Sequence, residues 1–540
     1  MRDIPRTPPR RVNTLWPDSV AIAKRHAVPC AAALVLFFGL NLLPMLIMGR
    51  SDSLGNNTDS IYHYLKILRL RGELSPDASL DIDIRLPTDE RLYRGVSRIA
   101  DATGCTLVQT LQATWCVYSV VFVAGSYVLG WRVTGLPWGG SFVAASGWGF
   151  AMALGGHWGW DFSPVVPHDL AGAFVPWLLL AWRRIRSPAH SALYFAGLGL
   201  MAQVYPTTFV HLAMVSLVAQ FLLAPRRVMA LLAGAAAFGV AIVPLAHTWV
   251  GRGPVPREVM PLLQERLSYL SPGSVAGLWA EYKLFLLHAG LSVCAALLIS
   301  RRPQPPGWSR IRAVGVASIA AGIAGQFTAR IAWCAPLFVS RASHYVFPWF
   351  FLLQARTLAD RPRGWRLAAG LGLCAASLML RPNLAGPARA VLRGATIRDA
   401  VAEFHMQDTN EFRALCTWIN HHTVQTDVVL TPPDGRYLFL RAYARRPLVG
   451  LYKDLGAVTH ARSPLLLTNW AMTRAMKRAF EACDYGRVYA MALSRECAAI
   501  VFPPEWPPRP EASFANAAGW VVRLKAPDSP APIDTTMRGA

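Results

Sequence analysis

The sequence predicts a polytopic α-helical membrane protein that ends in a soluble α/β domain. Hydrophobic residues make up 53% of its 540 residues and charged residues only 16%, which argues against a disordered chain and an ordinary soluble enzyme. Apolar runs of about the length that a bilayer requires recur between residues 27 and 381. Beyond residue 381 the pattern changes to alternating helix-like and strand-like segments.

The formal net charge of +23 fits this class better than it fits a nucleic-acid-binding protein. Most of the excess lies in short arginine clusters between apolar runs, which is the distribution expected of cytoplasmic loops. A basic stripe with interleaved aromatic residues is missing, so we expect no nucleic-acid partner. The nine cysteines have no metal-ligand spacing.

The chain begins with a basic lead and an anchoring helix. Residues 1–26 are rich in Arg, Lys and Pro, which predicts a flexible cytoplasmic segment. The first apolar run, 27–48, is longer than the core of a signal peptide and is not followed by a small-x-small cleavage site. We therefore expect an uncleaved membrane anchor.

A polar loop, residues 49–106, follows the first apolar run. A loop of this length in a folded protein is usually ordered by packing onto something else. Two stretches of it have apolar residues at helical spacing: Ile61, Tyr64, Leu65 and Leu68, and Leu92, Val96, Ile99 and Ala100. We expect two amphipathic helices on the membrane surface, with the acidic residues at the water boundary.

Further apolar runs follow, and with the first they give about eleven membrane spans. Their predicted ranges are 107–130, 138–156, 168–182, 189–204, 206–223, 227–247, 282–300, 312–329, 334–355 and 365–381. Placing the N-terminus inside puts the arginine clusters on the cytoplasmic side, whereas the outer connections 157–167 and 204–206 contain no Lys or Arg. This alternation predicts that the first loop and the C-terminal domain lie outside.

Residues 382–525 are predicted to form the soluble α/β domain, and 526–540 a disordered tail. An apolar face at helical spacing predicts a helix over 411–420, and a second helix is expected over 469–483. Strand signals occur at 427–430, 437–443, 447–452 and 497–502.

Three groups of polar residues are predicted to share the outer boundary of the membrane. They are Asp52 and Asp59; His157 and Asp161; and Arg330, Arg341 and His344. Carboxylates accept protons or hold divalent cations, and cationic side chains bind lipid phosphates. Asp59 directly precedes an amphipathic helix, so it is equally suited to cap that helix.

The layout resembles the GT-C class of integral membrane glycosyltransferases, in which a first span leads into a long acidic outer loop with two surface helices. Three stretches are similar to uncharacterised bacterial members of that class: Leu198-Gly-Leu-Met-Ala-Gln-Val-Tyr-Pro-Thr-Thr, Arg341-Ala-Ser-His-Tyr, and the tail run from Trp418 to Lys453. The chain departs from the protein O-mannosyltransferases, because its Asp-Glu pair, Asp89-Glu90, comes late in the loop.

The resemblance implies that a sugar moves from a polyprenyl-phosphate carrier to a glycan, lipid or protein acceptor on the periplasmic face of a bacterial inner membrane. The donor and the surrounding membrane lipids are the expected partners. Asp59 would be the base, with Asp52 or Asp161 in support, and a Mg²⁺ or Mn²⁺ ion, if one is used, would lie at Asp52 and Asp59. The implied substrate-binding residues are Arg341, His344, Arg330 and His157.

Two other functions fit the same composition. A lipid or polysaccharide transporter or flippase would have many spans and interfacial arginines, with broken helices near the midplane. A non-catalytic envelope assembly protein would use the C-terminal domain to bind a partner. Counterflow of substrate without covalent transfer would favour the transporter, and a partner held by the C-terminal domain alone would favour the assembly protein.

Overall fold

The described part of the chain, in a computed structural model, is mostly helical. The structure describes residues 26–35, 58–74, 87–150, 167–223, 228–251, 253–266, 308–328, 330–334, 345–359, 361–369, 389–397, 409–450 and 465–525, together with the single positions 290, 293, 294, 297, 337, 339, 342, 372 and 400. Residues 1–25 of the predicted basic segment, 1–26, and the whole predicted tail, 526–540, lie outside these residues.

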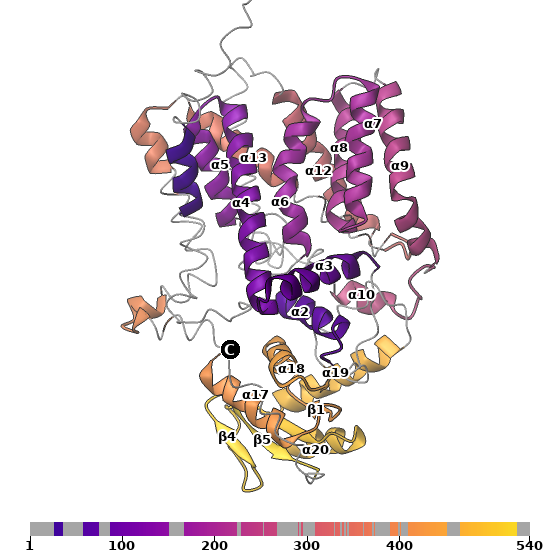
Figure 1. The fold of residues 1–540 in the computed structure, drawn as a ribbon, viewed down its shortest axis with the longest axis vertical. Helices are drawn as coiled ribbons and strands as arrows, with labels where there is room; N and C mark the ends of the chain where they lie inside the picture. Colours follow the sequence, from indigo (N-terminus) through magenta and orange to yellow (C-terminus); the bar gives the residue numbers. More distant parts are fainter. Residues whose placement is uncertain are drawn as a thin grey trace, which may run out of the picture.

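A helical bundle forms the larger part of the described molecule (Figure 1). Its helices are α4 (Leu107–Thr134), α5 (Pro137–Phe150), α6 (Pro167–Trp182), α7 (Pro188–Ala202), α8 (Pro206–Leu223), α9 (Val228–Gly251), α12 (Trp308–Thr328) and α13 (Val346–Ala359). Helices α5, α6, α7 and α8 each begin at a proline, because proline has no N–H to lose at a helix start and its fixed φ suits the first position.

Helix α4 has clear signals at both ends. Thr106 accepts a hydrogen bond from the backbone N–H of Gln109, and the Gln109 side chain caps Thr106 in return. Gly135 ends the helix in the left-handed conformation, with φ 76°, which a residue with a side chain rarely adopts. The helix is 28 residues long, or about 42 Å, and it runs the length of the bundle.

Three helices in the described part of the chain are long and apolar enough to cross a membrane. They are Leu107–Thr134, Pro206–Leu223 and the Val228–His247 part of α9. The described residues therefore support three membrane spans by length and composition, and not the predicted number of about eleven. Helical segments occupy the other expected ranges that the structure describes, but they are shorter or less apolar, such as His26–Val35 and Leu170–Trp182.

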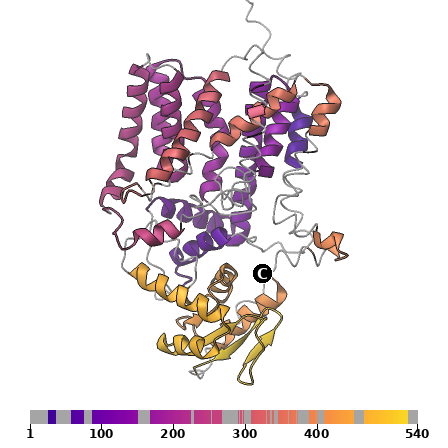
Figure 2. The ribbon, with the colours of Figure 1, turned by 180° about the vertical axis from the view of Figure 1, so that it is seen from behind.

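Three short helices lie at one end of the bundle: α2 (Thr58–Leu70), α3 (Pro87–Thr103) and α10 (Met260–Arg266). Both the front and the back view place them between the bundle and the C-terminal domain (Figures 1 and 2). The two helices expected in the first polar loop are thus present, at 58–70 and 87–103.

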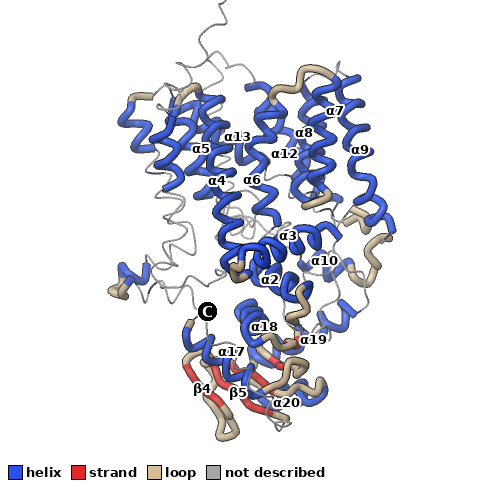
Figure 3. Tube along the Cα trace, viewed as in Figure 1, coloured by secondary structure: helices blue, strands red, loops and turns tan. Residues whose placement is uncertain are grey.

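The C-terminal domain is built on one sheet, and Figure 3 shows the described strands gathered there, beyond the short helices. Its elements are α17 (Asn410–His422), β1 (Val429–Leu430), α18 (Leu438–Ala444), β2 (Leu448–Val449), α19 (Leu465–Glu481), α20 (Tyr485–Ser494), β3 (Ala499–Phe502), β4 (Phe514–Asn516) and β5 (Gly519–Arg523). The strand order is β2-β1-β3-β5-β4, in which β2, β1 and β3 are parallel and β5 and β4 are antiparallel additions.

The two faces of the sheet bury different sets of side chains, as strand alternation requires. Leu430, Ile500 and Phe502 point into a core formed with α19 and α20. Val429 and Val501 point into the opposite core, formed with α17 and α18. This second core continues without a break into α2, α3 and the first turns of α4.

The structure corrects three local predictions. Residues 438–444 form helix α18 rather than a strand, and the hairpin of β4 and β5 was not predicted. Ile99 was expected on the apolar face of its helix but is 52% exposed, because α3 buries Tyr93, Val96 and Ala100 instead. The apolar stripe of α2 packs against the C-terminal domain and not against a membrane surface.

Candidate functional site

The predicted site residues fall partly on the described chain. Asp59 is the second residue of α2, inside the first helical turn rather than at the capping position that was considered for it. Arg330 lies in an exposed turn directly after α12. The remaining predicted residues lie outside the described residues: Asp52, His157, Asp161, Arg341 and His344.

Position 59 belongs to the polar face of α2. A helix advances 100° per residue, so positions 59, 62, 63 and 66 share one side of it. Those positions hold Asp59, Tyr62, His63 and Lys66. Tyr62, His63 and Lys66 are half-buried, so the polar face is partly enclosed and not fully solvated.

Helix α3 contributes a tyrosine to the same face. The Nδ1 atom of His63 is hydrogen-bonded to the hydroxyl of Tyr93, which is 2% exposed. The Lys66 ammonium lies 4.9 Å from the ring centroid of Tyr62 and 5.8 Å from that of Tyr93, within the range of cation–π attraction. An imidazole, an ammonium and two phenol rings therefore gather one to two turns beyond Asp59.

Asp59 was predicted from the sequence as a site residue, whereas His63, Lys66 and Tyr93, which gather near it, were not predicted. The positions of His63 and Lys66 relative to Asp59, i+4 and i+7, were a usable signal for two of them. No pattern in the sequence links Tyr93 to α2, because the packing of α3 on α2 brings it there.

The opposite face of α2 fixes the helix in place. Ile61, Leu65 and Leu68 are at most 5% exposed and share one hydrophobic core with Phe439 and Leu440. Helix α18 is the neighbour of α2 in that core. The position of the polar face of α2 is consequently fixed by the same hydrophobic core that stabilises the C-terminal domain.

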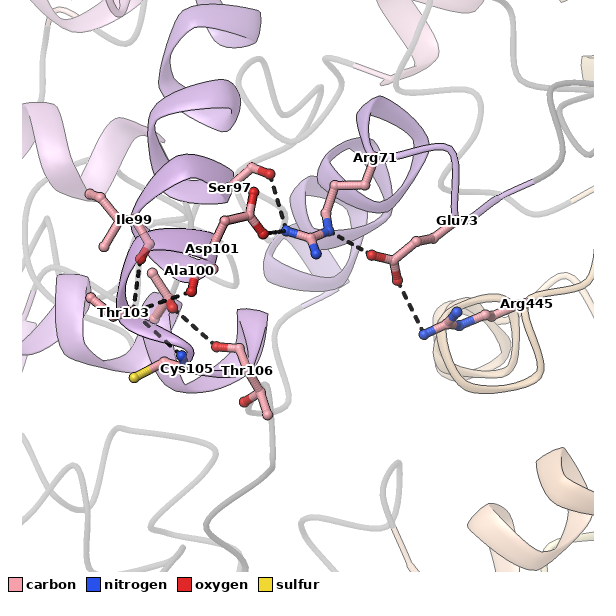
Figure 4. A network of polar contacts seen from close by, with 11 residues as sticks. Arg71, Glu73, Ser97, Ile99, Ala100, Asp101, Thr103, Cys105, Thr106 and Arg445 are labelled. Atoms are coloured by element: carbon pink, nitrogen blue, oxygen red, sulfur yellow. Dashed lines mark hydrogen bonds and ion pairs between the residues drawn. The ribbon is translucent and has the colours of Figure 1, made fainter. Parts of the chain in front are cut away.

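Charged residues reinforce this contact at the end of α2 (Figure 4). Arg71 binds Glu73 at 2.5 Å and Asp101 at 2.8 Å, and it also donates to Ser97 at 3.1 Å. Glu73 in turn pairs with Arg445 of the C-terminal domain at 3.3 Å. These hydrogen bonds raise the pKa of Arg71 above its ordinary value, the bond to Glu73 contributing most.

A second junction lies inside the bundle, at the start of α8. The Tyr345 hydroxyl donates to the carbonyl oxygen of Thr208 at 2.6 Å, and His211 Nε2 lies 2.6 Å from the carbonyl oxygen of Leu337. The end residues of two stretches singled out in the sequence, Thr208 and Tyr345, therefore meet. They are 137 residues apart in the chain.

Arg330 contacts neither the polar face of α2 nor the start of α8 through a described hydrogen bond or ion pair. Its guanidinium makes no hydrogen bond or ion pair within the described residues. The turn that holds it is fixed through the backbone, because the N–H of Val255 donates to the carbonyl oxygen of Ala332 at 3.2 Å.

The residues present do not define a metal site. Across the described ranges, no three His, Cys, Asp or Glu side chains are grouped so that they could hold a metal ion. Of the two carboxylates expected to bind Mg²⁺ or Mn²⁺, Asp52 lies outside those ranges, so the pair cannot be assembled from them.

Searches of protein-family profiles and of curated protein sequences find no match to this chain.

Proposed function

We propose that the protein is a membrane glycosyltransferase that moves a sugar from a polyprenyl-phosphate carrier to an acceptor on the outer face of a bacterial inner membrane. The observation that carries this proposal is the polar face of α2, where Asp59 shares a helix side with His63 and Lys66. That face lies at the end of a largely apolar bundle and is held there by the C-terminal domain.

Exposed apolar side chains on the bundle support a membrane location. Only 11% of the apolar window in α9 is buried inside the protein, and Leu232, Val240 and Val243 on it are 55–75% exposed. A helix with so much apolar surface would be unfavourable in water, whereas acyl chains cover it without cost.

The distribution of arginine supports the orientation. Four arginines lie near one another: Arg132, Arg183, Arg184 and Arg310. Arg310 donates a hydrogen bond to the carbonyl oxygen of Arg183. Burial lowers the pKa of Arg183, and the positive charges of the other three arginines lower it further. Arg132 is near the end of α4 that is remote from α2. Arginine clusters favour the cytoplasmic side, which puts α2 and the C-terminal domain outside.

The reaction assigned to the site is direct glycosyl transfer, in which an acceptor hydroxyl attacks the anomeric carbon of the sugar. Asp59 takes the proton from an acceptor hydroxyl as its oxygen attacks that carbon. The bond between the anomeric carbon and the phosphate oxygen breaks, and the polyprenyl phosphate leaves with its negative charge. Lys66 stabilises that charge, while Tyr62 offers a ring against which a sugar face can pack.

The test is a transfer assay with purified full-length protein in lipid nanodiscs, labelled polyprenyl-phosphate-linked hexoses and pentoses, and glycan or lipid acceptors. Asp59→Asn should reduce transfer by about 10²–10⁴-fold, the usual contribution of a general base. The matched control is Asp101→Asn, which makes the same change on α3, at the Arg71 pair, and should retain transfer. Unchanged transfer by Asp59→Asn would remove Asp59 from the mechanism.

A further inference from the structure

The residue before helix α8 is a tyrosine, which has no short side-chain oxygen to cap the first helical turn. Helices α4, α7 and α17 are each capped by a hydroxyl oxygen, from Thr106, Ser187 and Thr409. Helix α8 is preceded by Tyr205, and the backbone N–H groups of Thr207 and Thr208 have no hydrogen-bond partner in the described part of the chain. Free N–H groups at the start of an 18-residue helix form an anion-binding position.

The Thr208 hydroxyl is a second, independent sign of a ligand. It is buried, with Thr208 only 3% exposed, and it has no hydrogen-bond partner among the residues that the structure describes. Other threonines in the helices donate to the carbonyl oxygen four residues earlier: Thr110, Thr114, Thr134, Thr357 and Thr473. Thr208 does not, so its hydroxyl remains available to a group that the protein itself does not supply.

The position of this hydroxyl coincides with the free backbone donors. Side chains in a helix tilt toward its N-terminus, so the hydroxyl of the third residue of α8 lies over the first turn. The hydroxyls of Ser119 and Ser126 in α4 also lack partners within the described ranges, but they lie inside a helix whose N–H groups are used by the helix itself. Thr208 combines an unused hydroxyl with a helix start.

We propose that the start of α8 binds the phosphate group of a membrane lipid through the N–H groups of Thr207 and Thr208 and the Thr208 hydroxyl. The helix dipole favours a negative charge there. The neighbouring contacts of Tyr345 and His211 hold this end of the helix in a fixed position. The inference rests on the proposed function only for the class of the lipid, a polyprenyl phosphate, and it makes Thr208 a residue that binds the phosphate of this lipid.

The test compares Thr208→Val with the parent, using purified full-length protein in detergent and four labelled probes. The probes are a polyprenyl phosphate, the corresponding polyprenol, phosphatidylglycerol and inorganic phosphate. We expect the variant to bind polyprenyl phosphate about tenfold or more weakly, since a hydrogen bond to a charged group is lost, and to bind polyprenol as the parent does. Thr114→Val, which removes a hydroxyl already bonded within α4, should leave binding unchanged.

Stability separates a binding role from a structural one. Because valine replaces an unpartnered buried hydroxyl, the unfolding temperature of Thr208→Val should be equal to or above that of the parent. Equal binding of polyprenyl phosphate by variant and parent, or an equal loss for polyprenol, would overturn the phosphate site. A matching loss for phosphatidylglycerol or inorganic phosphate would support the phosphate site and assign it to phosphates in general.

The outcomes also separate this inference from the proposed function. Weaker lipid-phosphate binding by Thr208→Val, in a protein that transfers no sugar, would support the phosphate site and contradict the glycosyltransferase. Normal binding by Thr208→Val, in a protein whose transfer depends on Asp59, would contradict the phosphate site alone.

Discussion

Two adjacent arginines after α18 show how the same side chain serves different purposes in this protein. Arg446 is 5% exposed and donates to Thr423 Oγ1, Ala444 O, Asn420 O and Thr423 O, at 2.6–3.0 Å. Burial lowers its pKa, although the Asp427 carboxylate opposes the shift. Arg445 is much more exposed and reaches across to Glu73. Arg446 therefore organises the C-terminal domain internally, whereas Arg445 links it to the first polar loop.

Replacing Arg446 by methionine should lower the free energy of unfolding of the C-terminal domain by about 3 kcal/mol or more, because several buried acceptors lose their donor. Arg445→Met should cost less than about 1 kcal/mol, the usual value of an exposed ion pair. Urea unfolding followed by tryptophan fluorescence measures both. Similar losses for the two variants would contradict the distinction.

Tyr437 should make the C-terminal domain less stable at alkaline pH. Burial is the main cause that raises its pKa to about 12, whereas an unfolded chain has the ordinary value near 10. The neutral form is favoured in the fold, so its contribution is complete below pH 10 and is lost as the unfolded chain deprotonates between pH 10 and 12. The loss should reach about 2–3 kcal/mol.

The Tyr437→Phe variant provides the comparison, because it cannot ionise at this position. The difference in unfolding free energy between parent and variant should be constant up to pH 10 and should then shift in favour of the variant. A difference that stays constant from pH 8 to pH 12 would show that Tyr437 is not the group responsible.

At the scale of elements, α2 offers a matched pair of leucines. Leu68 is 1% exposed and lies in the core shared with the C-terminal domain, whereas Leu70, two residues later, is 37% exposed. Leu68→Ala should destabilise the C-terminal domain by about 2–5 kcal/mol through the cavity it leaves, and Leu70→Ala by less than about 1 kcal/mol.

The measurement is the urea midpoint of the C-terminal domain in the full-length protein, reported by Trp506 and Trp520, which are buried in that domain. Equal and small effects of the two substitutions would mean that α2 does not stabilise the domain. The same packing implies that the C-terminal domain expressed alone exposes the surface that α2 covers.

Many of the helices and strands could be predicted from the sequence, because the spacing of apolar residues within a short segment indicates which element it forms. The apolar period of α17, with Phe412, Leu415 and Ile419 buried, and the short strand at Val429 were recognisable for that reason. Helix α18 was not, because its run of apolar residues, Leu438 to Leu440, is buried on all sides and such a run fits a strand equally well.

The site was predictable only where it depends on spacing within one helix. Asp59, His63 and Lys66 share a face because of helical geometry, and that relation is present in the sequence. The meeting of Thr208 with Tyr345 and the contact of Tyr93 with His63 depend on tertiary packing. No local pattern reports which distant residues will meet.

For the whole molecule, the proposed function requires that α2 and the C-terminal domain lie on the outer side of the membrane. Glu73, which pairs with Arg445, and the shared hydrophobic core require that both lie on the same side. The arginines around Arg183 lie at the other end of the bundle. If this arrangement spans a membrane as proposed, a lipid-linked donor would reach the polar face of α2 from the outer leaflet.

The most direct measurement is the sidedness of single cysteines in intact cells, probed with a charged, membrane-impermeant maleimide. In a cysteine-free background, Cys105 and Cys483 are restored one at a time, since both are exposed, and Arg186→Cys marks the other end of the bundle. We predict that Cys105 and Cys483 react in intact cells, while the cysteine at position 186 reacts only after the membrane is permeabilised. Labelling of position 186 in intact cells, with Cys105 and Cys483 protected, would place Asp59 in the cytosol and contradict the account.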